Sequence, residues 1–299
     1  MTLTAEILME LEDIACRKDQ PLARHTSMQV GGPAAILAEP EERAGLALLL
    51  QTLHERRLPF YMLGSGTNVL FGDEGFHGVV IKLGEDFRFI RRMNENDLEV
   101  GAATPLTVLV GRTIDLGLMG LEFCQGIPGT VGGAAAGNAG RDGIGIHDGI
   151  TKVHGYTTRG EYVTINRGDY SYGYRKVEGL DIIITSVEIH LEKADAKKQK
   201  TLLEKYDAVR SKQPPASGTA GSIFKNPPGD FAGRLIEQAG MKGYCVGGAM
   251  VSPQHANWII NKGKATAGDV LALIEEIKNS VNQKFGILLE TEVKIVNPQ

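Results

Sequence analysis

A glycine-rich segment in the middle of the chain, Gly126 to Ala134, restricts the fold more than any other stretch. It reads Gly-Ile-Pro-Gly-Thr-Val-Gly-Gly-Ala, and no charged residue occurs between Gly126 and Gly140. Glycine adopts positive φ and lets backbone amides approach a ligand without a Cβ in the way. The segment therefore predicts irregular backbone, with no regular helix or strand running through it. Two interpretations are open at this point: a wall for a flat, partly anionic ligand, or a glycine-rich turn in a packed core.

Length and composition indicate a globular protein of more than one domain. The 299 residues, 42% hydrophobic and 23% charged, leave room for two or three domains. A net charge of −4 without a basic stripe argues against a nucleic-acid partner. No signal-peptide pattern and no membrane-spanning apolar run occurs, so we expect a cytoplasmic protein without a membrane partner. The three scattered cysteines and seven histidines form no metal-binding motif, so we expect no metal.

The hydrophobic pattern predicts a mixture of helices and strands, which is an α+β fold. Helical spacing of apolar residues covers 7–15, 41–57, 105–116, 202–209, 231–239 and 266–281. Strand patterns cover 34–38, 59–63, 79–83, 87–91, 98–100, 151–156, 162–165, 182–191, 244–250, 258–260 and 287–296. The charged stretch 192–198 marks a change in composition, and we take it as the domain boundary.

A second glycine-rich loop, Gly64-Ser65-Gly66-Thr67-Asn68, directly follows the predicted strand 59–63. It lacks the lysine of a P-loop and the third glycine of a Rossmann fingerprint, so both motifs are excluded. What remains is a turn whose amides and hydroxyls suit a pyrophosphate, or an ordinary turn after a strand.

Five segments together point to a family. They are Gly64–Asn68, Gly126–Gly133, Tyr174-Arg175, Ala220–Lys225 and Leu289–Val293. In their order and spacing the sequence resembles the UDP-N-acetylenolpyruvoylglucosamine reductases, from about Arg24 to the last predicted strand. It is similar to the shorter branch of that family, which lacks an extra tyrosine-bearing insertion.

The resemblance implies both an architecture and a reaction. The expected fold is an FAD-binding domain of the vanillyl-alcohol oxidase (PCMH) type over residues 1–193, with two subdomains that divide near 73–78. A smaller C-terminal α/β domain, residues 194–299, is expected to bind substrate. The implied reaction is NADPH-dependent, FAD-mediated reduction of UDP-N-acetylglucosamine enolpyruvate to UDP-N-acetylmuramate, in peptidoglycan precursor synthesis. The implied partner is therefore a small UDP-sugar, and no protein partner is implied.

Three residues match the catalytic positions of that family. Arg175 corresponds to the arginine that binds the substrate carboxylate, where a guanidinium binds more strongly as negative charge develops. Ser222 corresponds to the serine that protonates the substrate. Glu292 corresponds to a glutamate that donates a hydrogen bond from its protonated form. Glu290 is the alternative, because alternation along a strand would put both glutamates on one face.

The resemblance also implies binding residues. For FAD they are Gly64, Ser65, Gly66, Thr67, Asn68, Gly126, Ile127, Pro128, Gly129, Thr130, Gly132, Gly133, Asn138, Gly140 and Arg234. For substrate they are Tyr174, Lys225 and Arg210. Lys225 is also the nearest cation in sequence to Ser222. Two segments depart from the family pattern, Ala135–Gly137 and Arg141–Gly143, so the flavin pocket is expected to be altered or roomier there.

Two other functions are compatible with the same motifs. An FAD-linked oxidase or dehydrogenase acting on a hydroxylated small molecule would keep the fold and change the substrate, but it requires a general base. A catalytically silent flavin- or nucleotide-binding protein would be expected to lack one of Arg175, Ser222 and Glu292. All three residues are present.

Overall fold

The computed structural model describes residues 14–296, and these residues divide into two compact units. Of the described residues, the first unit contains 14–18, Ile36–Gly64 and Gly78–Arg210, and the second contains Asp19–Ala35, Ser65–His77 and 211–296. This partition differs from the division at 193 and 194 inferred from the sequence, which stays a prediction.

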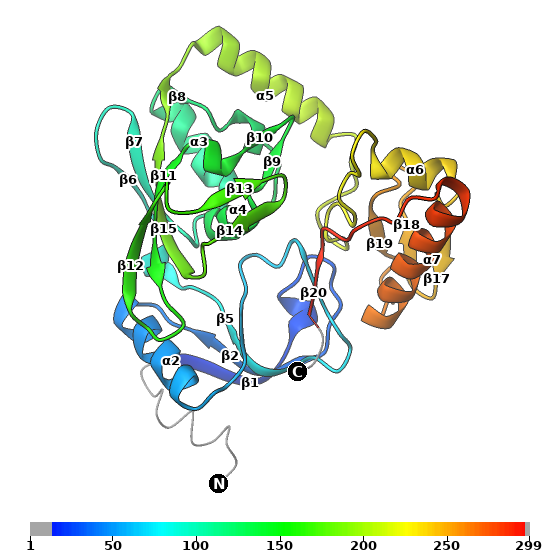
Figure 1. Ribbon diagram of the computed structural model, residues 1–299, viewed down its shortest axis with the longest axis horizontal. Coiled ribbons are helices and arrows are strands. Elements are labelled where there is room, and N and C mark those ends of the chain that lie inside the picture. Colours follow the sequence, from blue (N-terminus) through cyan, green and yellow to red (C-terminus); the bar gives the residue numbers. More distant parts are fainter. Residues whose placement is uncertain (1–13, 297–299) are drawn as a thin grey trace. The chain divides into compact units, whose positions relative to one another are not determined.

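The first unit contains helix α2 (Arg43–Glu55) packed on strands of a four-stranded sheet (Figure 1). The sheet has the order β1 (Ala15–Pro21), β2 (Pro33–Glu39), β5 (Phe76–Ile81), β3 (Phe60–Met62). The buried face of α2 consists of leucines at helical spacing, namely Leu46, Leu49, Leu50 and Leu53. They form one core with Ile36, Val79 and Ile81 of the sheet. The predicted helix 41–57 and strand 34–38 are thereby confirmed.

A five-stranded antiparallel sheet forms the rest of the first unit, together with α3 and α4 on one face. Its order is β12 (Tyr162–Asn166), β11 (Ile150–Tyr156), β15 (Ile183–His190), β7 (Asp97–Gly101), β6 (Ile90–Arg92). The covering helices are α3 (Leu106–Asp115) and α4 (Val131–Gly137). Short pairs complete the unit: β8 (Leu118–Met119) with β16 (Glu192–Lys193), β9 (Gly140–Arg141) with β10 (Ile144–Gly145), and β13 (Ser171–Gly173) with β14 (Lys176–Glu178). Helix α5 (Ala196–Arg210) is the last element.

Helix α4 corrects the prediction of irregular backbone through the glycine-rich segment. It begins at Val131, after Thr130, whose hydroxyl accepts a hydrogen bond from the Gly133 amide at 3.3 Å. It ends at Asn138, which adopts the left-handed conformation with φ 44°. A threonine N-cap and an asparagine at the C-terminal end are ordinary helix boundaries. The weak helix propensity of glycine is overcome here because Val131, Ala134 and Ala135 are buried in the core.

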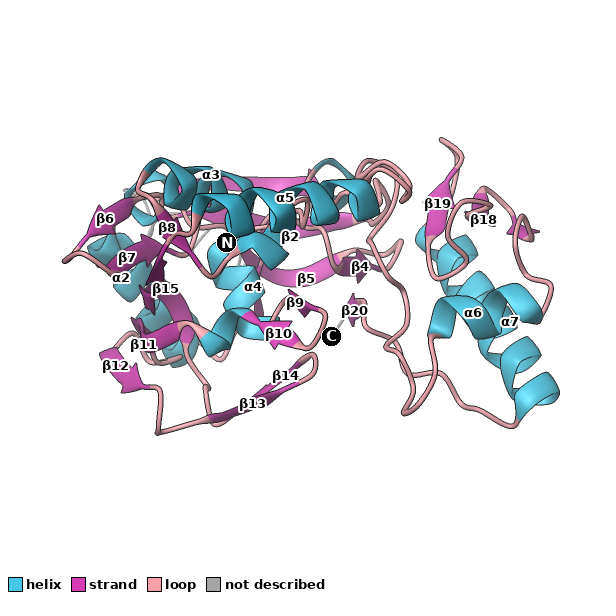
Figure 2. Ribbon diagram, turned by 90° about the horizontal axis from the view of Figure 1, so that it is seen from above, coloured by secondary structure: helices cyan, strands magenta, loops and turns pink. Residues whose placement is uncertain are grey.

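The second unit has one core between two helices and a small sheet (Figure 2). The sheet has the antiparallel order β17 (Cys245–Val246), β18 (Ala249–Val251), β19 (Ile259–Asn261). Helices α6 (Ala232–Gln238) and α7 (Ala267–Phe285) pack beside it, with Val270, Leu273 and Ile277 fully buried. A parallel pair, β4 (Val69–Phe71) with β20 (Lys294–Val296), belongs to the same unit.

Several predicted elements are wrong in extent. The expected strand 287–296 is regular only over β20, with one isolated bridge between Thr291 and Phe224 before it. The expected strand 244–250 is a hairpin, because Gly247 has φ 52° and reverses the chain between β17 and β18. The predicted helix 7–15 lies outside the described residues except for its end, where Ala15 begins strand β1.

The start of α7 is held by Asp73, which lies just after β4 in the same unit. Its carboxylate accepts hydrogen bonds from the Ala267 and Gly268 amides, each at 2.8 Å. These amides have no partner inside the helix, and a carboxylate also suits the positive end of the helix dipole. Asp73 therefore connects the β4 segment to the longest helix.

We expect Asp73→Ala to lower the free energy of unfolding by about 1–2 kcal/mol, because two helix-end amides lose their acceptor. Chemical denaturation measures the change. The neighbouring Glu74→Ala is the control, since Glu74 is an exposed side chain, and it should change stability by less than about 0.5 kcal/mol. Equal effects of the two substitutions would contradict the role of Asp73.

Candidate cofactor and substrate site

In the first unit, the two glycine-rich loops meet at Gly64 and Thr130. A Cβ added at Gly64 would lie 2.8 Å from the Thr130 hydroxyl oxygen, so only glycine fits without displacing it. That hydroxyl is the N-cap of α4. The close approach of the loops thus depends on the same atom that begins the glycine helix.

The amides of the Gly126 loop fall into two groups. Those of Val131 and Gly132 donate to the Thr104 and Ala102 carbonyls at 2.9 Å, and that of Gly133 donates to Thr130. Among described residues, the amides of Gly126, Gly129 and Thr130 donate to no protein acceptor. The amides able to bind an anion are therefore those of the turn before α4. Gly126 and Gly129 also have φ values of 73° and 133°, which glycine adopts without strain.

The rest of the first loop, Ser65 to Asn68, belongs to the second unit. Gly66 has φ 65°, and a Cβ there would lie 2.1 Å from the His25 carbonyl oxygen, so glycine is required. Its own carbonyl accepts a hydrogen bond from the Ser27 amide at 2.9 Å. Within residues 14–296, the amides of Ser65, Gly66 and Asn68 donate to no other protein group. The loop is thus held through the Gly66 carbonyl, and these three amides are not used by the protein.

Arg175 occupies the turn of the β13–β14 hairpin in the first unit. Gly173 pairs with Lys176, so Tyr174 and Arg175 form a two-residue turn. Arg175 has φ 55°, a left-handed conformation that is unfavourable for a side chain of this kind. Its guanidinium lies 5.3 Å from the ring centre of Tyr174, which is an exposed side chain. The hairpin is tied to the end of α4, because the Asn138 side-chain amide donates to the Gly173 carbonyl at 2.8 Å.

The second unit brings the Ser222 and Glu292 segments side by side. The Glu292 amide donates to the Ile223 carbonyl at 2.8 Å, and the Asn68 side chain donates to the Glu292 carbonyl at 3.3 Å. Ser222 itself forms an isolated bridge with Trp258. Three motifs that are far apart in the sequence therefore meet in this unit. The geometry does not support a regular strand at Glu290 and Glu292, so alternation no longer relates those two side chains.

Lys225 is held by Glu290. The two side chains form an ion pair at 2.5 Å, and the Lys225 amide donates to the Glu290 carbonyl at 2.9 Å. Glu290 is the more exposed of the two glutamates, and Glu292 is half-buried.

The remaining predicted residues have diverse surroundings. Arg234 is engaged on α6 by Asp230 and by Gln238, whose side-chain oxygen lies 2.8 Å from its Nη1. The side-chain stem of Arg210 covers Gly126, where an added Cβ would lie 2.8 Å from its Cγ. Gly140 pairs with Gly145 in the β9–β10 hairpin, and a Cβ there would strike the Ile144 carbonyl oxygen at 2.0 Å. Gly140 thus has a structural reason to be glycine.

Sequence reasoning missed Asn257, which positions the Ser222 segment. Its side-chain amide donates to the Phe224 carbonyl at 2.8 Å, and its side-chain oxygen accepts from the Phe224 amide at 3.0 Å. The side chain of Asn257 thus pairs with the backbone as a neighbouring strand would. No local sequence signal distinguishes such an asparagine from a loop residue.

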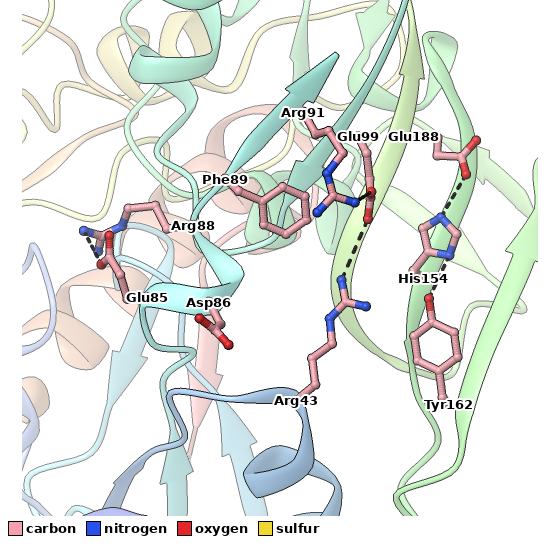
Figure 3. A pocket seen from close by; sticks show the side chains of 10 residues that line it. All are labelled: Arg43, Glu85, Asp86, Arg88, Phe89, Arg91, Glu99, His154, Tyr162 and Glu188. Atoms are coloured by element: carbon pink, nitrogen blue, oxygen red, sulfur yellow. Dashed lines mark hydrogen bonds and ion pairs between the residues drawn. The ribbon is translucent and has the colours of Figure 1, made fainter. Parts of the chain in front are cut away.

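A polar hollow of about 690 Å³ also lies in the first unit, apart from the predicted site residues (Figure 3). It is lined by Arg43, Glu85, Asp86, Arg88, Phe89, Arg91, Glu99, His154, Tyr162 and Glu188. Its polar side chains are paired across strands: Glu99 with Arg91 at 3.1 Å, and Glu188 with His154 at 3.1 Å. This arrangement is typical of the solvent face of an antiparallel sheet.

Comparison with known proteins identifies the family. Residues 213–296 match the family model of the UDP-N-acetylenolpyruvoylglucosamine reductase C-terminal domain, and residues 34–166 match that of an FAD binding domain. UDP-N-acetylenolpyruvoylglucosamine reductase 2 of Symbiobacterium thermophilum is 41% identical over 93% of this chain and 91% of its own length. The reductase of Caldanaerobacter subterraneus is 39% identical over 98% of this chain and 99% of its own length. The chain belongs to the UDP-N-acetylenolpyruvoylglucosamine reductase family.

A solved structure of the same family agrees. The crystal structure of UDP-N-acetylenolpyruvylglucosamine reductase (MurB) from Thermus caldophilus has a TM-score of 0.80 and 34% identity, covering 94% of this chain and 98% of that one. The predicted α+β fold, with an FAD-binding domain and a C-terminal domain of this family, is confirmed. The chain is an FAD-dependent oxidoreductase.

The residues present fit FAD. In each unit, glycine positions leave backbone amides unused at the loops named above, where a Cβ would fill the space. Unused amides at such turns suit a pyrophosphate. Within residues 14–296, no group of three histidine, cysteine, aspartate or glutamate side chains is arranged to hold a metal ion. None of the described helices is long and apolar enough to cross a membrane.

We expect Gly64→Ala to weaken FAD binding several-fold, because the new methyl group displaces the Thr130 hydroxyl from its position at the start of α4. Fluorescence titration of the apoprotein with FAD measures the dissociation constant. Gly111→Ala is the control, since nothing lies within 4 Å of a Cβ at that exposed helix position. Unchanged FAD affinity in Gly64→Ala would show that the close approach of the two loops is not needed.

Arg175→Gly should leave the free energy of unfolding unchanged or raise it by up to about 1 kcal/mol, because glycine adopts the left-handed conformation without strain. Denaturant unfolding measures the difference. In Lys176→Gly, at the next position of the hairpin and with ordinary strand backbone, we expect a loss of about 0.5–1 kcal/mol instead. Destabilisation by both substitutions would contradict the interpretation of strain at Arg175.

Proposed function

We propose that this chain reduces UDP-N-acetylglucosamine enolpyruvate to UDP-N-acetylmuramate, with NADPH as the hydride donor, in peptidoglycan precursor synthesis. Relatives that bear the name of this reductase match it over nearly its whole length, and both of the domain families found support the proposal. The substrate is a water-soluble nucleotide sugar, which supports a cytoplasmic location. The division into residues 1–193 and 194–299 stays part of the proposal.

FAD, when bound, supplies the group that accepts and delivers a hydride. We assign its phosphates to the amides of Gly126, Gly129 and Thr130 in the first unit, and to those of Ser65, Gly66 and Asn68 in the second. Gly132 and Gly133 use their amides within the protein, so any contact of theirs is through the Cα surface. The apolar residues Ile127 and Pro128 are left to border the ring system. Thr67, Asn138, Gly140 and Arg234 complete the FAD-binding set inferred from the sequence.

Arg175 is assigned to the carboxylate of the enolpyruvyl group. Hydride addition to an enol ether that bears a carboxylate shifts negative charge onto the carboxylate oxygens. A planar guanidinium donates two parallel hydrogen bonds to such an anion, and these strengthen as the charge develops. The observation that carries this assignment is the positive φ of Arg175. A residue other than glycine at positive φ costs conformational energy, and functional sites are one place where such residues occur.

Ser222 and Glu292 are assigned to the proton chemistry. Ser222 donates the proton that completes the lactyl ether, and Glu292, held protonated, donates a hydrogen bond to the same carboxylate. Their segments share the Ile223–Glu292 hydrogen bond, which supports a common role. Lys225 is paired with Glu290, so its effect on the acidity of Ser222 is reduced by that carboxylate. We assign Lys225, Arg210 and Tyr174 to substrate binding, where the cations offset the diphosphate charge.

The experiment that tests this function separates the two half-reactions. We expect the yellow, FAD-loaded protein to bleach with NADPH under anaerobic conditions and to regain colour when UDP-N-acetylglucosamine enolpyruvate is added. A stopped-flow spectrophotometer follows both steps. Bleaching without recovery of the flavin colour would reject the reductase function. If the colour returned only on addition of the oxidised form of a hydroxylated small molecule, an oxidase or dehydrogenase function would be favoured.

Ser222→Ala should leave flavin reduction by NADPH within about twofold of the parent enzyme and slow reoxidation by substrate by about 10²-fold or more, because only the second step needs its proton. Single-turnover kinetics measure both rates. Ser217→Ala, an exposed serine in the same unit, is the matched control and should change neither. Equal loss in both half-reactions would point to a folding defect and contradict the role of Ser222 as proton donor.

A further inference from the structure

His147 is a fully buried histidine whose side-chain nitrogens both have partners. It lies in a single 3₁₀ turn, Ile146–Asp148, in the first unit, and is 0% exposed. Its Nε2 lies 2.7 Å from the Ala135 carbonyl of α4, and its Nδ1 lies 2.8 Å from the Tyr170 hydroxyl. A carbonyl can only accept, so Nε2 carries the hydrogen and Nδ1 accepts from Tyr170.

The surroundings keep this ring neutral. Burial lowers the pKa of His147, and the positive charge of Arg167 lowers it further, against the opposing effects of the Ala135 hydrogen bond and Asp148. The neutral ring matches the two hydrogen bonds, one donated and one accepted. His147 therefore acts as a fixed, planar side chain that links Ala135 to Tyr170 through hydrogen bonds, and not as an acid or base.

The flat face of His147 supports the hairpin that carries Arg175. The rings of His147 and Tyr172 are stacked, with centroids 5.2 Å apart and planes 27° apart. Tyr172 lies on β13, three residues before Arg175, and its hydroxyl donates to Asp148 at 3.0 Å. The Arg167 guanidinium lies 3.9 Å from the Tyr172 ring centre. Tyr172 is thus held by His147, Asp148 and Arg167.

A second connection runs through Asn138 at the end of α4. Its side-chain oxygen accepts from the His147 amide at 3.2 Å, while its side-chain nitrogen donates to the Gly173 carbonyl at 2.8 Å. Gly145 makes room for this side chain, since a Cβ there would lie 2.3 Å from the Asn138 oxygen. His147 therefore contacts Ala135 of α4, Asn138 just after the helix and Tyr172 of the hairpin, and Asn138 also contacts the hairpin at Gly173.

We propose that His147 is a positioning residue for Arg175: it fixes the β13–β14 hairpin on the end of the glycine helix α4. The inference rests on the proposed function of Arg175. The backbone at Arg175 is strained, and a strained residue keeps its conformation only where neighbouring contacts determine it. Tyr172 and Gly173 lie on β13 directly before the Tyr174–Arg175 turn, and both are held by the network around His147.

A purely structural role makes a different prediction from a positioning role. If His147 only fills the core, its loss should reduce FAD content, reduction by NADPH and stability together. If it positions Arg175, its loss should act on the step that needs the carboxylate contact. Small displacements of a binding group reduce a rate by about 10²-fold when the reaction depends on orientation.

The test compares His147→Ala, Arg175→Ala and the double variant in the FAD-loaded full chain. We expect His147→Ala to retain bound FAD and to be reduced by NADPH within about twofold of the parent rate. Its reoxidation by UDP-N-acetylglucosamine enolpyruvate should slow by about 10- to 100-fold. In the Arg175→Ala background, the same substitution should add less than about twofold, because the group that it positions is already gone.

Two further variants keep the result interpretable. His147→Gln retains a donor for Ala135 without the flat ring, so it should show the same selective defect even if His147→Ala folds poorly. His154→Ala is the control, because His154 is another partly buried, hydrogen-bonded histidine of the first unit. It should leave both half-reactions unchanged.

Each outcome decides the matter. Effects of His147→Ala and Arg175→Ala that multiply would show that the histidine acts independently, and would overturn the inference. A slow Arg175→Ala enzyme with normal His147→Ala and His147→Gln enzymes would overturn the inference and leave the proposed function intact. A normal Arg175→Ala enzyme would overturn the proposed role of Arg175 and, with it, this inference.

Discussion

The two caps of helix α4 are the interactions on which the rest of the first unit depends. Thr130 accepts the Gly133 amide at the start of the helix and lies against Gly64. Asn138 ends the helix in a left-handed conformation and uses its side chain to hold Gly173. A helix of glycine and alanine has weak propensity, so its position is set by these caps and by burial. The same two residues thereby connect the glycine-rich segment, to which FAD binding is assigned in the proposal, to the hairpin of Arg175.

The composition of the glycine-rich segment serves two separate purposes. The glycines of the turn, Gly126 and Gly129, adopt positive φ and leave amides unused by the protein. Gly132 lies in the helix, where a Cβ would come within 2.8 Å of the Ala102 side chain and 3.1 Å of its carbonyl oxygen. The first group suits ligand binding, and the second allows close packing on the sheet. The sequence motif does not distinguish these glycines, whereas the structure shows that those of the turn and the one in the helix have different roles.

Much of the fold and of the candidate site could be predicted from the sequence, but not all of it. The leucine spacing of α2 was sufficient because this helix is long and buries one continuous face, and the alternation of Val187, Ile189 and Leu191 with polar residues was sufficient to predict β15. The family, the α+β fold and the FAD chemistry followed from motifs in register. Helix α4 was missed because glycine content outweighed its cap signals, Thr130 and Asn138. The networks around His147 and Asn257 were not predictable, because they join buried side chains to backbone atoms distant in sequence.

Arg175 shows how a violated local rule indicates function. Glycine or asparagine would occupy its left-handed position at lower conformational energy, and natural chains usually agree with such preferences. An arginine at this position requires both a function for its guanidinium and surrounding contacts that hold the turn. The proposed binding of the substrate carboxylate supplies the use. The stacked ring of His147 and the Asn138–Gly173 hydrogen bond supply the surroundings. The strain at Arg175 and the burial of His147 thus have a single explanation. Neither the sequence motif nor the fold provides that explanation alone.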